Sequence, residues 1–423
     1  MPWLEDACAR KNDAYYEKVA NPSPENLAKY SKLKKITDKH IDLAKKKFYS
    51  DYFKEHQTDS KRQWQMINSL LNRNKKHINI SKIRDCDGNV ATSSQDIADK
   101  FNSYFANIAE KLKTKLPNSM SDAEINIGPQ NPKSIYLKPT NSTEVSLIID
   151  NLKVKATSDI NVVSIKKAKE NSSKFSEVIS DVINTSLTEG IFPTTMKTAK
   201  TVPIHKGGSK IDVQNYRPIS LLSAFSKIFE KIMYTRLYDF LSHNNILIDN
   251  QFGFRKGRSC EHALLTAHNE ILTSLNKKQT SMLLLIDFSK AFDMVDHEIL
   301  LSKLKHYGIR GIAHAWIKSY LSDRKQYVAL NNKKSSILDM IYGVPQGSIL
   351  GPLLFIIYIN DIPKICQAAK FVLYANDANI LITGKNMSEI ENSFKTLAKN
   401  LETWVNLNGL ALNLKKNKLH DIF

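Results

Sequence analysis

The segment LLLIDFSKAFD, residues 283–293, is the clearest structural signal in the chain. A short apolar run over residues 281–287 predicts a buried strand that ends at the carboxylate of Asp287. Mg²⁺ prefers carboxylate and phosphate oxygens, and the end of a rigid strand is a suitable place to hold it. The alternative is an ordinary strand that ends at a polar residue.

A second apolar run leads into Tyr-Ala-Asn-Asp at residues 374–377. Residues 370–383 predict a hairpin that turns near Asn376 and Asp377. If this hairpin pairs beside the first strand, Asp377 lies near Asp287, and two metal ions could assist an in-line phosphoryl transfer there. Taken alone, Asn-Asp is also ordinary turn chemistry.

Three further motifs contain residue types that suit nucleotides. The glycine-rich segment 343–348 lets backbone approach a ligand closely, and Gln346 could bind a base or sugar, although a loop before a buried helix is the alternative. Lys206 and Arg217 flank a predicted turn and could both reach a triphosphate. The segment QFGFRKGRS, residues 251–259, is a basic loop with regularly placed glycines that suits phosphates.

Composition and charge favour a globular protein with a polyanionic partner. The 423 residues are 42% hydrophobic, and 61 Lys and Arg against 42 Asp and Glu give a net charge of +19. Nucleic acid is the first expected partner and an anionic membrane surface the second. Residues 28–53 combine many lysines with aromatic residues, which predicts a phosphate-binding face or a solvated lysine face over an aromatic core.

The sequence predicts an intracellular protein, nuclear or cytoplasmic, with no membrane span. The longest apolar run, residues 349–359, is far shorter than the ~20 residues that a span needs. The cysteines are widely spaced with no C-x-x-C, so we expect reduced thiols. Cys260-Glu261-His262 is predicted to be a helix start, because a zinc site needs about four ligands.

Strands and helices mix without strict alternation after residue 142, which predicts an α+β fold. The stripe of Ile97, Phe101 and Phe105 at helical spacing predicts a core-facing helix. The proline-containing segment 116–142 is predicted to be a linker. The predicted domains are a helical basic N-terminal extension (1–115), that linker (116–142) and a catalytic domain (143–423).

The order of these motifs resembles the reverse transcriptase of non-LTR (LINE, jockey-type) retrotransposons. The resemblance runs from about residue 152 to the end, and the N-terminal part is similar to the segment that joins endonuclease to polymerase in such elements. It implies a right-hand polymerase with fingers (about 143–280) and palm (about 281–423), and a fragment that lacks endonuclease and thumb. The motifs are NYRPISLL (215–222), QFGFRKGRS (251–259), DFSKAFD (287–293), GVPQGSILGP (343–352), YAND (374–377) and residues 412–418.

The resemblance implies an RNA-directed DNA polymerase that extends a DNA primer on an RNA template with dNTPs and two Mg²⁺ ions, or Mn²⁺. Asp287, the carbonyl of Phe288 and Asp377 match the metal ligands, and Asp287, Asn376 and Asp377 occupy the catalytic positions. Arg255 and Arg258 match residues expected to face the template. The nucleotide-binding positions are Lys206, Arg217, Phe288, Phe292, Gln346, Gly347 and Lys416, with Phe292 as the bulky gate near the sugar 2′-position.

One departure from the family pattern affects the predicted chemistry. The family hairpin reads Tyr-Ala-Asp-Asp, and here neutral Asn376 replaces the first aspartate. Losing electrostatic stabilisation of this kind typically costs ~10²–10³ in rate, so the resemblance predicts a weakened or inactive catalytic centre. A non-enzymatic remnant that binds nucleic acid is the alternative, and an unrelated basic scaffold is the third hypothesis.

Overall fold

The computed structural model describes residues 2–71, 80–114, 127–152, 165–413 and 418–422. Contacts divide the chain into two units, Met1–Asn79 and Ile80–Phe423. The first unit is helical, as predicted, and α2 begins after Ser23, whose side chain accepts a hydrogen bond from the backbone N–H of Asn26. Its helices are α1 (Pro2–Ala20), α2 (Pro24–Glu55) and α3 (Ser60–Leu70).

The sequence analysis ended the N-terminal extension at residue 115, whereas the division of contacts falls after Asn79. The reason is helix α4 (Ser94–Lys113), which packs on strands of the larger unit. Phe101 and Phe105 on α4 are buried together with Tyr216 and Val328. The stripe of apolar residues on α4 is therefore core, as expected, but it belongs to the core of the larger unit.

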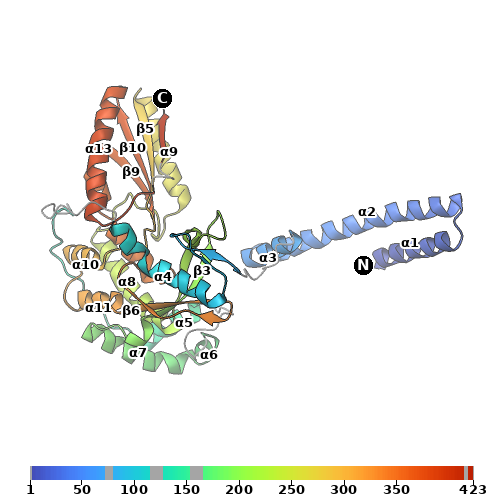
Figure 1. Cartoon of the computed structure of the whole chain (residues 1–423), viewed down its shortest axis with the longest axis horizontal. Coiled ribbons are helices and arrows are strands. Elements are labelled where there is room, and N and C mark those ends of the chain that lie inside the picture. Colours follow the sequence, from blue (N-terminus) through green and yellow to red (C-terminus); the bar gives the residue numbers. More distant parts are fainter. Residues whose placement is uncertain (1, 72–79, 115–126, 153–164, 414–417, 423) are drawn as a thin grey trace. The chain divides into compact units, whose positions relative to one another are not determined.

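A four-stranded antiparallel sheet contains the two motifs with which the sequence analysis began. The predicted strand and hairpin are both present, and Figure 1 shows their sheet between α13 (Met387–Leu407) and α9 (Cys260–Asn276). Successive residues of a strand point to opposite faces. Ile286 is therefore buried on the side of α13, while Ser281, an odd number of residues away, hydrogen-bonds Ser274 of α9. The strand order is β11 (Lys418–Ile422), β5 (Thr280–Asp287), β10 (Asp377–Gly384), β9 (Ala369–Tyr374).

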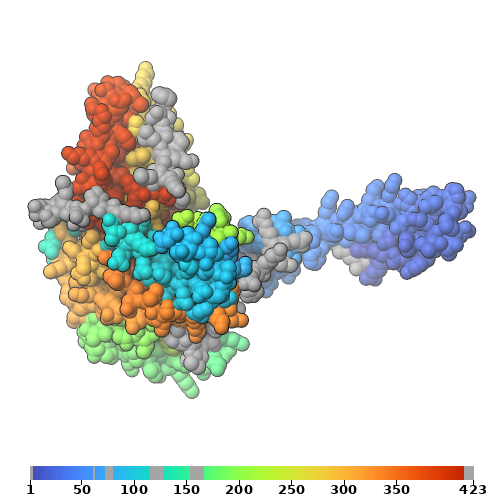
Figure 2. All heavy atoms as spheres, in the orientation of Figure 1, coloured from blue at the N-terminus to red at the C-terminus, as the bar shows by residue number. Residues whose placement is uncertain are grey.

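The second sheet of the larger unit holds the segment around Lys206 and Arg217. Its strands β3 and β4 are antiparallel neighbours, and β3 pairs in parallel with β6. Strand β6 pairs with the two short strands that follow it, β7 and β8. Figure 2 shows the cyan atoms of α4 against the orange atoms of this region. The strands are β3 (Thr198–His205), β4 (Tyr216–Leu221), β6 (Arg324–Leu330), β7 (Lys333–Lys334) and β8 (Leu338–Met340), and a separate pair is β1 (Ile83–Arg84) and β2 (Val90–Ala91).

Helices contribute most of the core of the larger unit. The apolar helix α12 (Leu350–Tyr358) is almost wholly buried, and the carboxylate of Glu230 accepts hydrogen bonds from the backbone N–H groups of Ile349 and Leu350 at its start. Burial raises the pKa of Glu230. The remaining α-helices are α5 (Ser142–Asn151), α6 (Ile165–Glu170), α7 (Ser172–Glu189), α8 (Ala224–His243), α10 (His297–His306) and α11 (Gly311–Leu321).

These elements confirm the predicted α+β class. Among the described residues, no helix combines the length and the apolar character that crossing a bilayer requires. Helix α9 begins at Cys260, in agreement with the predicted helix start. All four cysteines, at positions 8, 86, 260 and 366, are free thiols.

Candidate active site

The antiparallel sheet brings Asp287 and Asp377 together. The two residues are Cα partners at the same end of β5 and β10, so the predicted proximity is found. The turn between β9 and β10 consists of Ala375, whose φ is +56°, and Asn376. Asp287 is half-buried and Asp377 is exposed, so this end of the sheet is accessible from solvent.

Two asparagine amides hold the carboxylate of Asp287. Nδ2 of Asn376 donates to Oδ1 at 3.0 Å, and Nδ2 of Asn413 donates to Oδ2 at 2.7 Å. The backbone N–H of Asn413 also donates to the carbonyl of Asp287 at 2.8 Å. Sequence reasoning gave Asn413 no role, and its only signal was its position inside the motif at 412–418.

The turn that contains Asn376 rests on the segment 251–259. Oε1 of buried Gln251 accepts hydrogen bonds from the backbone N–H of Gly253 at 2.8 Å and of Ala375 at 3.0 Å. A Cβ on Gly253 would lie 2.2 Å from the nitrogen of Ala375, so only glycine fits this approach. The first residues of this segment therefore position the turn that contains Asn376, a role that the sequence analysis missed.

The two arginines predicted to face the template contact their own loop in this structure. Nη1 of Arg255 donates to the carbonyl of Ile248 at 2.7 Å. Nη2 of Arg258 donates to Oδ1 of Asp249 at 2.6 Å, and its guanidinium lies 5.3 Å from the centre of the Phe252 ring. A template contact by either arginine remains a prediction.

Three cationic side chains gather beside the turn between β3 and β4. Lys206 and Arg217 are exposed at the base of this turn, where the backbone N–H of Lys206 donates to the carbonyl of Asn215. Lys290 lies close to both, and burial together with the charge of Lys206 lowers the pKa of Lys290 to about 8. Its Nζ donates to the carbonyl of Tyr216 at 3.3 Å. The sequence analysis did not single out Lys290, although it lies within the 283–293 segment.

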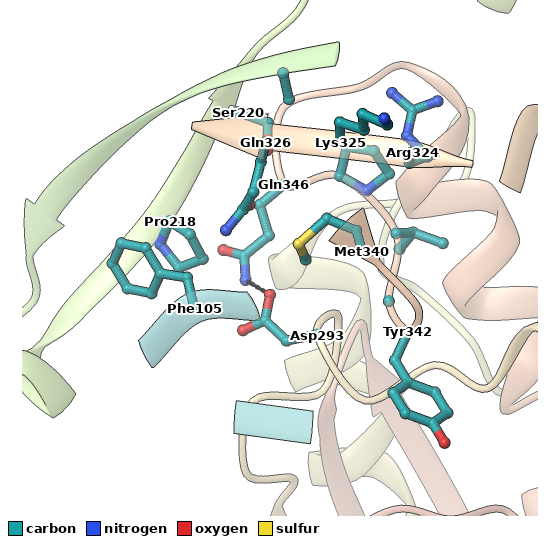
Figure 3. Close-up of a pocket in the computed structure, with 14 residues that line it drawn as sticks. Phe105, Pro218, Ser220, Asp293, Arg324, Lys325, Gln326, Met340, Tyr342 and Gln346 are labelled. Carbon is teal, nitrogen blue, oxygen red and sulfur yellow. Dashed lines mark hydrogen bonds between the residues drawn. The ribbon is translucent and has the colours of Figure 1, made fainter. Parts of the chain in front are cut away.

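A pocket against strands β3, β4 and β6 of the second sheet contains Gln346 and Asp293 (Figure 3). Nε2 of Gln346 donates to Oδ1 of Asp293 at 2.8 Å, and Oδ2 of Asp293 is buried with no hydrogen-bond partner among the described residues. Burial raises the pKa of Asp293 to about 6, against the opposing charge of Lys290. A carboxylate only accepts hydrogen bonds, so Asp293 fixes the amide nitrogen of Gln346 toward itself. The sequence analysis did not identify Asp293.

The glycine-rich segment 343–348 lies against both β4 and the 283–293 segment. The backbone N–H of Ser220 donates to the carbonyl of Gln346 at 2.8 Å. Gly347 has φ +131°, and a Cβ there would lie 2.5 Å from the carbonyl oxygen of Ser220. Phe292 is half-buried and its ring stacks on Phe355 with centroids 4.7 Å apart, which fixes the ring that the sequence analysis predicted as a gate.

The residues around Asp287 fit magnesium only in part. Magnesium is commonly held by one or two carboxylates together with substrate phosphates, and Asp287 and Asp377 satisfy that requirement for one ion. The ring of Phe288 is buried beside Trp404, and its carbonyl belongs to the residue that directly follows Asp287. Within the described ranges, no three His, Cys, Asp or Glu residues gather to hold a metal, and Asn376 stands at the position of the third expected carboxylate.

One predicted site residue, Lys416, lies outside the residues that the structure describes. Of the remaining predicted positions, the structure places some in two groups. Asp287, Asn376 and Asp377 lie at the end of the antiparallel sheet, and segment 343–348 lies beside β4.

Comparisons with known proteins give a consistent result. Residues 204–421 match the family described as reverse transcriptase (RNA-dependent DNA polymerase). Three similar curated proteins from Drosophila melanogaster are named as RNA-directed DNA polymerases. The probable polymerase from transposon BS is 32% identical, over 67% of this chain and 32% of the relative. The polymerase from mobile element jockey is 30% identical, over 56% of this chain and 26% of the relative. The probable polymerase from transposon X-element is 29% identical, over 53% of this chain and 25% of the relative. The chain spans about a quarter to a third of the length of these relatives.

Proposed function

The chain belongs to the reverse transcriptase family, and we propose that it forms the fingers and palm of an RNA-directed DNA polymerase from a non-LTR retrotransposon. The observation that supports this function best is the pairing of Asp287 with Asp377 at one end of the antiparallel sheet. The expected substrates are an RNA template, a DNA primer and dNTPs. An intracellular location, nuclear or cytoplasmic, belongs to the same proposal.

The proposed nucleotide site combines charge with steric selection. Lys206, directly after β3, and Arg217, on β4, are exposed, and together with Lys290 they supply positive charge for a triphosphate. Gln346, whose amide nitrogen is fixed by Asp293, would present its carbonyl oxygen to the nucleotide. The further proposed contacts are Phe292 at the sugar 2′-position, Phe288 and Gly347 by their backbone, Lys416 near the triphosphate, and Arg255 and Arg258 on the template.

We propose Mg²⁺, with Mn²⁺ as the alternative, held by Asp287, the carbonyl of Phe288 and Asp377. Bound there, the metal would stabilise the negative charge of the triphosphate during phosphoryl transfer. The chain itself contributes two carboxylates on adjacent strands, whose separation the backbone pairing fixes. Binding of a second ion is expected to be weak, because Asn376 offers a neutral amide in place of a carboxylate.

The asparagine at position 376 favours a second candidate function, which is nucleic-acid binding without synthesis. In the structure, both carboxylate oxygens of Asp287 accept hydrogen bonds from amides, of Asn376 and of Asn413. These contacts compete with a metal ion for the same oxygens. We therefore expect synthesis to be reduced by ~10²–10³ relative to a chain with aspartate at position 376.

Primer extension on an RNA template, with Mg²⁺ or Mn²⁺, tests the proposal. The wild-type chain is compared with Asn376→Asp and with Asp287→Ala, and binding of the template–primer is measured in parallel. Extension that rises in Asn376→Asp and disappears in Asp287→Ala supports the polymerase and the role of Asn376. Equal extension by wild type and Asn376→Asp would contradict that role. Binding without extension in all three would favour the second candidate.

A further inference from the structure

The N-terminal unit presents a long helix with one covered face. Helix α1 packs against α2, and Oγ1 of Thr37 on α2 donates to the carbonyl of Ala7 on α1 at 3.1 Å. Thr37 and Ala44 are buried and mark the face of α2 that α1 covers. Because α1 has 19 residues and α2 has 32, the C-terminal part of α2 continues beyond α1 (Figure 1).

Five lysines of α2 form a stripe on roughly the opposite side from Thr37 and Ala44. At about 100° per residue, they fall within an arc of about 100°, and all five are exposed. The stripe extends over about 33 Å of helix, at 1.5 Å per residue. Its members, called the lysine stripe below, are Lys32, Lys35, Lys39, Lys46 and Lys54.

The lysine stripe lacks neutralising partners of its own. None of its members forms an ion pair with another described residue, whereas nearby Lys29 pairs with Glu17 of α1 at 2.5 Å. The acidic residues Asp38 and Asp42 lie beside the stripe on one side and Asp51 on the other, and none of the three forms an ion pair with a stripe lysine among the described residues. Lysines four apart on a helix, such as Lys35 and Lys39, repel each other by about 0.2–0.5 kcal/mol, so an external polyanion would relieve an unfavourable arrangement.

We propose that the lysine stripe binds the phosphodiester backbone of a nucleic acid, without sequence preference and separately from the polymerase site. Lysine ammonium groups act as compact charges that suit phosphates. Duplex DNA carries one negative charge per ~1.7 Å of its axis, so a 33 Å stripe can face many phosphates at once. Binding releases condensed counterions and therefore weakens steeply as salt rises. This proposal does not depend on polymerase activity.

The test compares two double variants of the full chain with the same loss of charge. Lys39→Gln/Lys46→Gln removes two members of the stripe, and Lys34→Gln/Lys45→Gln removes two exposed lysines from another side of the same helix. Affinity for a single-stranded RNA and for a DNA duplex of equal length is measured in EDTA over a range of salt concentrations. Far-UV circular dichroism checks that both variants remain helical.

Loss of two phosphate contacts should make the negative slope of log K against log salt shallower, by about 1.8 for the duplex and about 1.4 for the single strand. At about 0.1 M salt this corresponds to roughly 20–60-fold weaker binding by the stripe variant, with a much smaller effect in the control. Comparison of the two ligands identifies the preferred nucleic acid. Equal effects in both variants would overturn the proposal. So would a stripe-specific loss of binding to anionic phospholipid vesicles with nucleic-acid binding unchanged.

Discussion

The change Asn376→Asp should destabilise the protein in the absence of metal and make its stability depend on magnesium. In the structure, Nδ2 of Asn376 donates to Oδ1 of Asp287 at 3.0 Å. The variant replaces this donor by a carboxylate oxygen, so a hydrogen bond to a charged group, worth about 1.5–3 kcal/mol, is lost. Two carboxylates about 4 Å apart also repel by about 4 kcal/mol at an effective dielectric constant of 20.

These two costs overlap, because the new carboxylate can turn toward solvent from its half-buried position. We therefore expect the free energy of unfolding to fall by about 2–4 kcal/mol in EDTA. Magnesium bound only by the folded state should reverse the loss, by about 2.7 kcal/mol at a concentration 100 times its dissociation constant. The wild type should gain less, since it has one carboxylate fewer at this point.

The assay is chemical denaturation of both proteins in EDTA and over a magnesium titration. Asn269→Asp, at an exposed position on α9, controls for the same chemical change away from the site. The reasoning would be refuted if Asn376→Asp were as stable as the wild type in EDTA, or if magnesium stabilised the two equally. Neither outcome depends on whether the chain can extend a primer.

Two further predictions concern buried charges. Because burial raises the pKa of Asp293 to about 6, the wild type should lose up to about 3 kcal/mol of stability as pH rises from about 4 to 6, and Asp293→Asn should lack this loss. Denaturation of both proteins at several pH values measures the difference. The same pH dependence of stability in both proteins would contradict the prediction. Lys303 and Asp361 form a fully buried ion pair at 2.5 Å. Lys303→Met should lower the free energy of unfolding by about 3–5 kcal/mol, because it leaves the charge of Asp361 without its ion-pair partner. The double variant Lys303→Met/Asp361→Leu should recover much of this loss in the same denaturation assay. A double variant no more stable than the single one would contradict the prediction.

The strands of the candidate site could be predicted from the sequence because their signals are local. The apolar run before Asp287 and the Asn-Asp turn each define an element without reference to the rest of the chain. The pairing of Asp287 with Asp377 then required only that the hairpin lie beside the strand, and the register of β5 and β10 confirms it.

The contacts that support the site could not be predicted in this way, because they join distant segments. Asn413 reaches Asp287 across 126 positions, and Gln346 reaches Asp293 across 53. The apolar stripe on α4 was correctly predicted as core, but local spacing does not state which surface it covers. Helix propensity and turn chemistry define elements, whereas tertiary packing selects their partners.

The structure also explains how position 376 can lose a charge while the fold persists. The register of β5 and β10 depends on backbone pairing from Asp287 to Thr280, and buried Gln251 holds the turn through the N–H of Ala375. None of these contacts needs a carboxylate at position 376. Asparagine has nearly the same shape as aspartate and donates to Asp287 where aspartate would repel it. The replacement therefore favours the metal-free fold, and we expect it to lower the affinity for metal, which is the expected direction where stability and activity oppose each other.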